Sequence, residues 1–184
     1  YYATVLGVTQ AQAVGLGFEC AGVVTAVGEG VSHLAVGDRV MGLGALEGTF
    51  ADYLPLPAAQ MTRIPAAMSD REAATIPLTF LTAWYGLVEL AQLQPGERVL
   101  IHAAAGGVGQ AAVQIAQAMG AEIFATASPG KWDFLRQQGV THLLNSRTLD
   151  FADELLSLTA GQGVAVVLNS LNGDFIEHSF AALG

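Results

Sequence analysis

Residues 98–127 read RVLIHAAAGGVGQAAVQIAQAMGAEIFATA, and this stretch decides the fold. The apolar run 98–103 predicts a buried strand, and the apolar residues of 107–120 recur at the spacing of a helix that ends at Gly120. A second apolar run, 122–127, predicts another strand. A strand, a glycine-rich turn, a helix and a second strand form a βαβ unit, in which the two strands lie parallel in one sheet.

The same alternation continues along the chain. Residues 131–139 and 151–163 predict helices, and residues 141–145 and 164–170 predict strands. Strands that alternate with helices in this way indicate an α/β fold with a Rossmann-type parallel sheet. A complete dinucleotide-binding fold has six strands, so we expect this sheet to be truncated. Both ends of the sequence look internal, and we expect a piece of a longer polypeptide.

The first third of the chain has a different pattern. Short segments at 18–28, 37–43 and 50–56 predict strands separated by tight turns, as in a fragment of a β-barrel or sandwich. We therefore expect two domains, a partial β-barrel domain at 1–68 and a dinucleotide-binding domain at 69–184.

Two helices are predicted near the start of the second domain. Ser69 followed three residues later by Glu72 predicts a helix that begins with a capping box. Pro77 interrupts that helix, and residues 78–93 predict a second one.

The composition excludes several classes of protein. The 184 residues are 52% hydrophobic and 12% charged, which is typical of a folded protein. A net charge of −9 leaves no basic stripe for a nucleic-acid backbone. The apolar segments are too short and too interrupted for a transmembrane helix. The one cysteine, Cys20, allows neither an intrachain disulfide nor a cysteine-built zinc site, and we expect a cytoplasmic protein.

The turn between the first predicted strand and its helix has the spacing of a phosphate-binding loop. Ala104, Gly106 and Gly109 fit the frame in which small residues permit a tight turn and a close approach to a pyrophosphate. The N–H groups at the start of the helix would face the phosphates. This pattern predicts a dinucleotide site, and the alternative is a glycine-rich turn without a ligand.

The residues after the second predicted strand indicate which dinucleotide binds. An NAD site usually carries Asp or Glu about 20 residues past the glycines, and here that position falls on 127–129, Ala-Ser-Pro. Lys131, Arg136 and Arg147 follow, opposed only by Asp133. A basic patch favours the 2′-phosphate of NADPH. The alternatives are a solvated helix face for Lys131 and Arg136, and a loop-capping role for Arg147.

Together these segments carry a resemblance. GFECAGVVTAVGEGV, GDRVMGL, the stretch 77–127, NSRTLDF and VVLNSLNG resemble the enoylreductase domains of modular polyketide synthases. Those domains belong to the zinc-free, quinone-reductase-like side of the medium-chain dehydrogenase/reductase superfamily. The resemblance implies that the β-barrel is GroES-like. It also implies that no metal binds, because Phe18 stands where alcohol dehydrogenases have a ligand histidine, and that Glu19 is structural.

The resemblance also implies a set of cofactor contacts. The pyrophosphate would lie on Gly106, Gly107, Val108 and Gly109. The adenosine 2′-phosphate would lie near Ser128, Lys131, Arg147 and, as a helper, Ser146. The ribose or nicotinamide would approach Asn169, Ser170 and Leu171. The nicotinamide pocket would include Thr79 and Thr82, whose hydroxyls could instead bond back to their own helix.

No catalytic residue is assigned within this chain. The proton donors of the family, a Tyr, a Lys and an Asp, fall outside the sequence, and Tyr1, Tyr2 and Tyr53 do not stand at the Tyr position. His102 is interpreted as a packed strand-end residue. Cys20 is interpreted as a small buried hydrophobe. The other histidines are interpreted as surface or turn residues, namely His33, His142 and His178.

The resemblance implies an NADPH-dependent reduction of the 2,3 double bond of an enoyl thioester. The substrate would be carried on acyl carrier protein, with neighbouring synthase domains as partners and no role for nucleic acid or membrane. One alternative adds the same hydride but diverts the enolate to ring closure by internal displacement. Two others are a free-standing quinone or enone reductase and a non-catalytic NADPH-binding structural domain.

Overall fold

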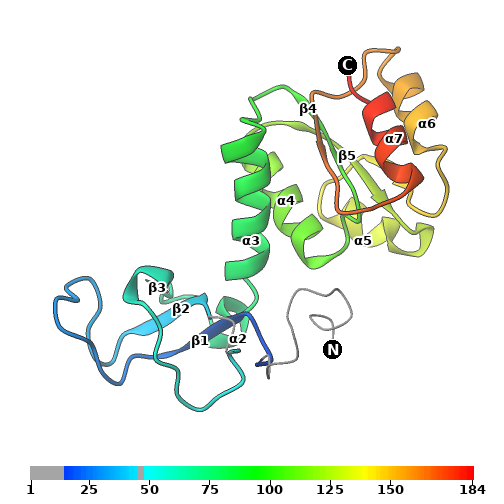
Figure 1. The fold of residues 1–184 in the computed structure, drawn as a ribbon. Coiled ribbons are helices and arrows are strands. Elements are labelled where there is room, and N and C mark those ends of the chain that lie inside the picture. Colours follow the sequence, from blue (N-terminus) through cyan, green and yellow to red (C-terminus); the bar gives the residue numbers. More distant parts are fainter. Residues whose placement is uncertain (1–14, 45–47) are drawn as a thin grey trace. The chain divides into compact units, whose positions relative to one another are not determined.

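The computed structural model describes residues 15–44 and 48–184. The chain forms two compact units, Tyr1–Leu78 and Thr79–Gly184 (Figure 1). The boundary expected from the sequence, between 68 and 69, lies N-terminal to this division and stays a prediction.

The first unit contains a three-stranded antiparallel sheet. Its strands are β1 (Glu19–Val23), β2 (Arg39–Leu43) and β3 (Met61–Arg63), in the order β1-β2-β3. The strands predicted within 18–28 and 37–43 are thus present, as β1 and β2. A short 3₁₀ turn, η1 (Ala58–Gln60), leads into β3.

The prediction of a strand at 50–56 was wrong, because this segment has no regular structure. Pro55 lies within it and Pro57 follows directly, and neither can donate a backbone hydrogen bond to a strand ladder. The third strand is instead the three-residue segment after η1, which is too short to give an alternating pattern.

Two helices follow the sheet of the first unit. The capping box predicted for α2 (Asp70–Ala73) is confirmed, since the Glu72 N–H donates to the Ser69 hydroxyl and the Ser69 N–H donates to the Glu72 carboxylate. Helix α3 (Pro77–Trp84) begins at the proline and continues as a π-helical segment, η2 (Tyr85–Leu90). The helix predicted after Pro77 is therefore present.

The second unit contains a four-stranded parallel sheet in the order β6-β5-β4-β7. Its elements alternate as predicted. They are β4 (Arg98–Ile101), α4 (Gly107–Ala118), β5 (Glu122–Ala127), η3 (Pro129–Lys131), α5 (Trp132–Gln137), β6 (His142–Asn145), α6 (Phe151–Leu158), β7 (Val166–Leu168) and α7 (Asp174–Ala181). The chain goes from β4 outward to β6 and then returns to place β7 on the other side of β4. This arrangement confirms the Rossmann-type sheet.

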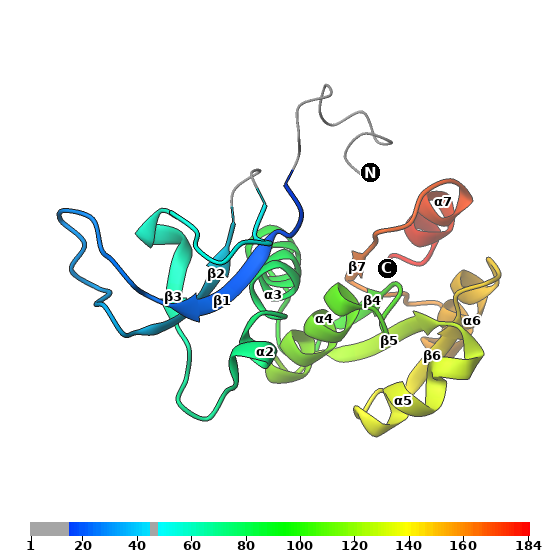
Figure 2. The ribbon, with the colours of Figure 1, turned by 90° about the horizontal axis from the view of Figure 1, so that it is seen from below.

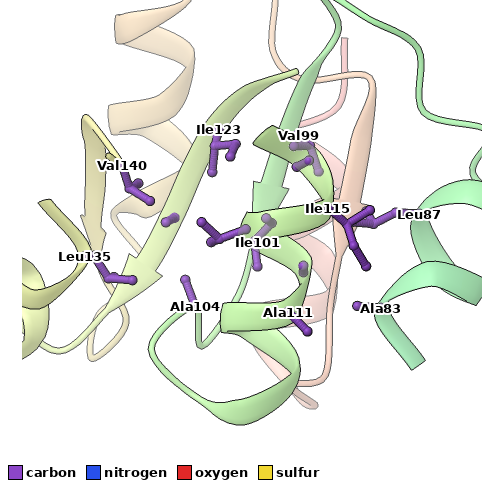
Figure 3. Packing of buried hydrophobic residues seen from close by; sticks show 14 of the residues in the cluster. Ala83, Leu87, Val99, Ile101, Ala104, Ala111, Ile115, Ile123, Leu135 and Val140 are labelled. Carbon is purple, nitrogen blue, oxygen red and sulfur yellow. The ribbon is translucent and has the colours of Figure 1, made fainter. Parts of the chain in front are cut away.

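Both faces of the parallel sheet are covered by helices (Figures 1 and 2). Val99 and Ile101 of β4 point to a cluster that includes residues of α3, α4 and α5, whereas Leu100 points to a cluster with α6. The period of two along β4 therefore divides its side chains between two cores. Figure 3 shows the first cluster, in which Ile115 of α4 packs over the sheet.

Candidate dinucleotide site

The predicted phosphate loop connects β4 to α4 at the carboxyl end of the sheet. Ala103 has a φ of 49°, a left-handed conformation that turns the chain away from the strand. The Gly106 N–H donates to the Ala103 carbonyl at 2.8 Å, and the Ala104 N–H donates to the Thr126 carbonyl of β5 at 3.0 Å. Gly106 is the N-cap of α4 and provides no side-chain cap. The first N–H groups of α4 therefore face outward from the strand end.

The glycines of the loop are required by close contacts. A Cβ on Gly109 would lie 2.4 Å from the Ala103 carbonyl oxygen, a backbone atom that cannot give way. A Cβ on Gly106 would lie 3.2 Å from the same oxygen, and one on Gly107 would lie 3.1 Å from the Thr79 methyl carbon. The loop is thus a small-residue cradle at a helix N-terminus, and its shape and dipole fit a pyrophosphate.

The structure brings the predicted 2′-phosphate residues together at the ends of β5 and β6. Ala127 pairs with Asn145 in the last register of the two strands. The Ser146 N–H donates to the Ala127 carbonyl at 3.1 Å, and the Lys131 N–H donates to the Ser128 carbonyl at 2.8 Å. These hydrogen bonds place the turn after β6 beside the turn after β5.

The basic residues near the ends of β5 and β6 differ in whether they form ion pairs. Arg136 pairs with Asp133 at 2.8 Å and lies over the Trp132 ring, as expected for a helix-surface residue. Lys131 and Arg147 are exposed, and neither forms an ion pair with another described residue. Two of the three basic residues thus remain available to an anion.

The segment after β7 lies beside the phosphate loop. The backbone N–H of His102 donates to the Leu168 carbonyl at 3.1 Å, and this bond holds the end of β7 next to the end of β4. The Leu171 N–H donates to the Asn169 side chain at 2.7 Å, so the chain turns immediately after the strand. Asn169 and Ser170 are exposed at this turn. This is the point where the strand order reverses, and ligands of parallel sheets bind there.

The two threonines of α3 differ in their surroundings. Thr79 is half-buried, and its methyl group lies against Gly107 of the phosphate loop. Thr82 lies one turn further along the helix and is exposed. The structure thus brings Thr79 to the loop, while the position of Thr82 relative to a cofactor stays a prediction.

Both ring nitrogens of His102 have hydrogen-bond partners. The residue is 3% exposed, and its ring has Nδ1 3.0 Å from the Thr126 hydroxyl and Nε2 2.9 Å from the Ser179 hydroxyl. Burial lowers the pKa of His102 to about 4. The interpretation as a packed strand-end residue agrees with this burial, but sequence reasoning missed Thr126 and Ser179. One signal was available, since Thr126 is the only hydroxyl in the strand EIFATA.

Phe18 and Glu19 lie at the start of β1. Phe18 is 54% exposed, and the Glu19 carboxylate accepts a hydrogen bond from the Leu78 N–H at 2.9 Å. Cys20 is half-buried, and burial raises the pKa of its thiol. Within residues 15–44 and 48–184, no group of three or more His, Cys, Asp or Glu side chains is arranged to hold a metal.

The first unit has an open pocket of about 820 Å³ beside its sheet. Cys20, Val40 and Met61 line it from the three strands, and Tyr53 lines it from the irregular segment. In the described part of the chain, no helix is long and apolar enough to cross a membrane.

Comparisons with known proteins agree with this architecture. The alcohol dehydrogenase GroES-like domain model matches residues 2–66, and the zinc-binding dehydrogenase model matches residues 107–184. The pikromycin polyketide synthase component PikAII of Streptomyces venezuelae is 50% identical over 171 residues, covering 92% of this chain and 4% of that protein.

Two solved structures are also similar. The CurK enoyl reductase has a TM-score of 0.91 and 60% sequence identity, covering 100% of this chain and 55% of that chain. The CurF ER cyclopropanase from the curacin A biosynthetic pathway has a TM-score of 0.84 and 49% identity, covering 91% of this chain and 50% of that chain.

The chain spans a small part of PikAII and about half of each of the two solved structures. One family model matches the β-rich part of the chain, and the other matches the α/β part. The similar proteins are a polyketide synthase, an enoyl reductase and an ER cyclopropanase. The resemblance stated from the sequence motifs is confirmed. The chain belongs to the medium-chain dehydrogenase/reductase superfamily, with the enoylreductase domains of polyketide synthases.

Proposed function

We propose that the chain binds NADPH and takes part in reducing the 2,3 double bond of an enoyl thioester within a polyketide synthase. The observation that carries the proposal is the glycine cradle at α4, with Lys131 and Arg147 exposed at the ends of the two neighbouring strands. The substrate would be carried on acyl carrier protein, and other synthase domains would be the neighbours. The compartment would be the cytoplasm.

The residues of the chain would bind and orient the cofactor. When bound, NADPH supplies a hydride to the β-carbon of the enoyl group. The N–H groups at the start of α4 would hold the pyrophosphate, and Thr79 would limit the space beside the loop. Asn169 and Ser170 would contact the ribose or nicotinamide. The acid that completes the reduction is not assigned to any residue of this chain.

The preference for NADPH follows from the corner after β5. A 2′-phosphate is a dianion, and exposed Lys and Arg side chains attract it. The strand ends in Ala127 and Ser128, so this position has no carboxylate to accept the ribose 2′-hydroxyl of NADH. We expect binding of NADPH to be much tighter than binding of NADH.

The first test measures turnover in the full polypeptide. A carrier-bound 2-enoyl thioester is mixed with NADPH or NADH, cofactor oxidation is followed, and the product mass is determined. NADPH oxidation with a gain of two hydrogens in the product is expected. Tight NADPH binding with no oxidation of any enoyl substrate would favour a non-catalytic domain, and oxidation only with small quinones or enones would favour a free-standing reductase.

A second test isolates the 2′-phosphate site. Lys131→Gln and Arg147→Gln each remove one exposed cation, and we expect each to weaken NADPH binding about tenfold while leaving NADH binding nearly unchanged. Arg136→Gln is the matched control, because that arginine is already paired with Asp133. Equal losses for both cofactors would contradict the assignment of this corner to the 2′-phosphate.

Ring closure is the second candidate function. The CurF cyclopropanase is 49% identical to this chain, which supports a domain of this kind that diverts the enolate. The same assay separates the two reactions when the thioester carries a leaving group at the γ-carbon. Simple reduction retains that group, whereas internal displacement forms a carbon–carbon bond and releases it.

A further inference from the structure

His102 is buried with hydrogen-bond partners on both ring nitrogens. Nδ1 lies 3.0 Å from the Thr126 hydroxyl of β5, and Nε2 lies 2.9 Å from the Ser179 hydroxyl of α7. The ring also contacts Phe151 edge-to-face, with a centroid distance of 4.9 Å. An apolar side chain could fill this space, so the polar ring at this position needs a reason.

The partners determine where each proton lies. The Ser179 hydroxyl is 2.6 Å from the Phe175 carbonyl, and a carbonyl only accepts, so Ser179 donates there. Ser179 therefore accepts from His102 Nε2–H. A neutral ring then has a bare Nδ1, which accepts from the Thr126 hydroxyl. The Thr126 oxygen in turn accepts from the Ala103 N–H at 3.2 Å.

This chain of hydrogen bonds reaches three segments of the candidate site. Ala103 is the left-handed residue that opens the phosphate loop. Thr126 lies in β5, two residues before Ser128 of the 2′-phosphate corner. Ser179 lies on α7, the helix that follows the turn after β7. Every N–H and O–H donor of this hydrogen-bond network has an acceptor, which favours one arrangement of the three segments.

We propose that His102 is a positioning residue, which holds the Thr126 hydroxyl on the Ala103 N–H and thereby fixes the phosphate loop in its binding geometry. This inference rests on the proposed dinucleotide function. His102 itself would touch neither cofactor nor substrate. Without the ring, the Thr126 hydroxyl would turn toward another acceptor, and Ala103 would lose the bond that supports its left-handed conformation.

The test compares NADPH affinity with stability in the full chain. Thr126→Val removes the hydroxyl with little change of volume, and we expect at least about fivefold weaker NADPH binding. Thr126→Ser keeps the hydroxyl and should restore most of the affinity. Val140→Ala is the control, because Val140 is 2% exposed and precedes β6 at the opposite end of the sheet. It should lower the melting temperature without changing NADPH affinity.

Two substitutions of the histidine sharpen the test. The amide of His102→Asn lies near the position of Nδ1 and can accept from Thr126, whereas the amide of His102→Gln lies near Nε2 and reaches Ser179. We expect Asn to retain clearly more NADPH affinity than Gln, measured well below both melting temperatures. Equal affinities in these two variants, together with wild-type affinity in Thr126→Val, would overturn the positioning role.

A measurement on the wild-type chain covers the case in which variants do not fold. Nitrogen chemical shifts of the His102 ring at neutral pH should report the neutral Nε2–H tautomer, and an Nδ1–H tautomer or a charged ring would overturn the inference. This readout needs no cofactor. Failure of the wild-type chain to bind NADPH would instead overturn the proposed function, and the positioning role with it.

Discussion

At the scale of a single residue, position 109 requires glycine, because backbone atoms occupy the space that a side chain would need. A Cβ there would lie 2.4 Å from the Ala103 oxygen and 2.6 Å from the Ala104 Cα. The helix therefore approaches the strand end more closely than any other residue type would permit.

Gly109→Ala should force α4 away from the loop. We expect a loss of about 1 to 3 kcal/mol in unfolding free energy and a strong loss of NADPH affinity. Urea unfolding and titration calorimetry measure the two effects. The control is Gly28→Ala, since a Cβ at Gly28 meets no atom within 4 Å. Equal effects of the two substitutions would contradict the close-packing explanation.

His102 should make stability depend on pH. Burial lowers its folded-state pKa from 6.5 to about 4, so between these pH values the unfolded chain binds a proton that the folded chain does not. The free energy of unfolding therefore falls as the pH falls from 6.5 to 4, by at most about 3 kcal/mol from this group.

Comparison with His102→Gln isolates this contribution. Urea unfolding of both proteins is measured from pH 7 to pH 4, so that the carboxylates shared by both cancel. The stability advantage of the wild-type chain should shrink toward pH 4. Parallel stability curves over the whole range would show that His102 is not buried in its neutral form.

At the scale of the element, the start of α2 is stabilised by its capping box and by an ion pair. Arg39 of β2 donates to the Asp70 carboxylate at 2.7 Å and to the Met68 carbonyl at 2.7 Å. Local hydrogen bonds start the helix, and the Arg39 side chain attaches it to the sheet of the same unit.

Ser69→Ala removes both the hydroxyl that caps α2 and its bond to Glu72. We expect the first unit to lose about 1 kcal/mol of unfolding free energy. Ser157→Ala serves as the control, because Ser157 is an exposed residue inside α6, where alanine is well tolerated. Denaturant titration of both variants measures the difference. A similar small change in both would mean that the cap contributes little.

At the scale of the whole molecule, the second unit depends on the two cores that cover the faces of its sheet. Helix α6 shows how strongly burial varies within one element. Leu155 is fully buried against the sheet, whereas Leu158, three residues later, is 57% exposed. The same residue type on the same helix thus has two different environments.

Leu155→Ala should destabilise the second unit by about 2 to 5 kcal/mol, because it leaves a cavity in the core beside Phe151. Leu158→Ala should change the unfolding free energy by less than about 0.5 kcal/mol. Thermal and urea unfolding of the two variants measure the contrast. Comparable destabilisation by both would show that α6 does not pack on the sheet as described.

The order and type of most elements could be predicted because the signals are local. The bounds predicted for the second strand of the sheet, 122–127, match β5, since its residues from Ile123 to Ala127 are all buried. The strand predicted at 164–170 is shorter, Val166–Leu168. Val164 instead bridges to Leu183, and the chain turns at Asn169, whose side chain accepts from the Leu171 N–H. The segment 50–56 was predicted wrongly because its apolar residues suggested a strand that Pro55 and the following Pro57 prevent.

Part of the candidate site could likewise be predicted from the sequence, and part could not. The glycine frame and the lack of an acid after β5 are readable from spacing alone, because each depends on residues close in the chain. The bonds of His102 join residues 24 and 77 positions apart, and no periodic pattern predicts them.

The sequence by itself determined the alternation of strands and helices, the small residues of the phosphate loop and the basic residues after the second strand. Only the tertiary structure decided that β4 lies between β5 and β7, that Ser146 bonds to Ala127 at the end of β5, and that the His102 ring bonds to both Thr126 and Ser179. The physical reason is that hydrogen-bond geometry and side-chain periodicity act within one segment, whereas the packing of helices on both faces of a sheet brings distant segments together.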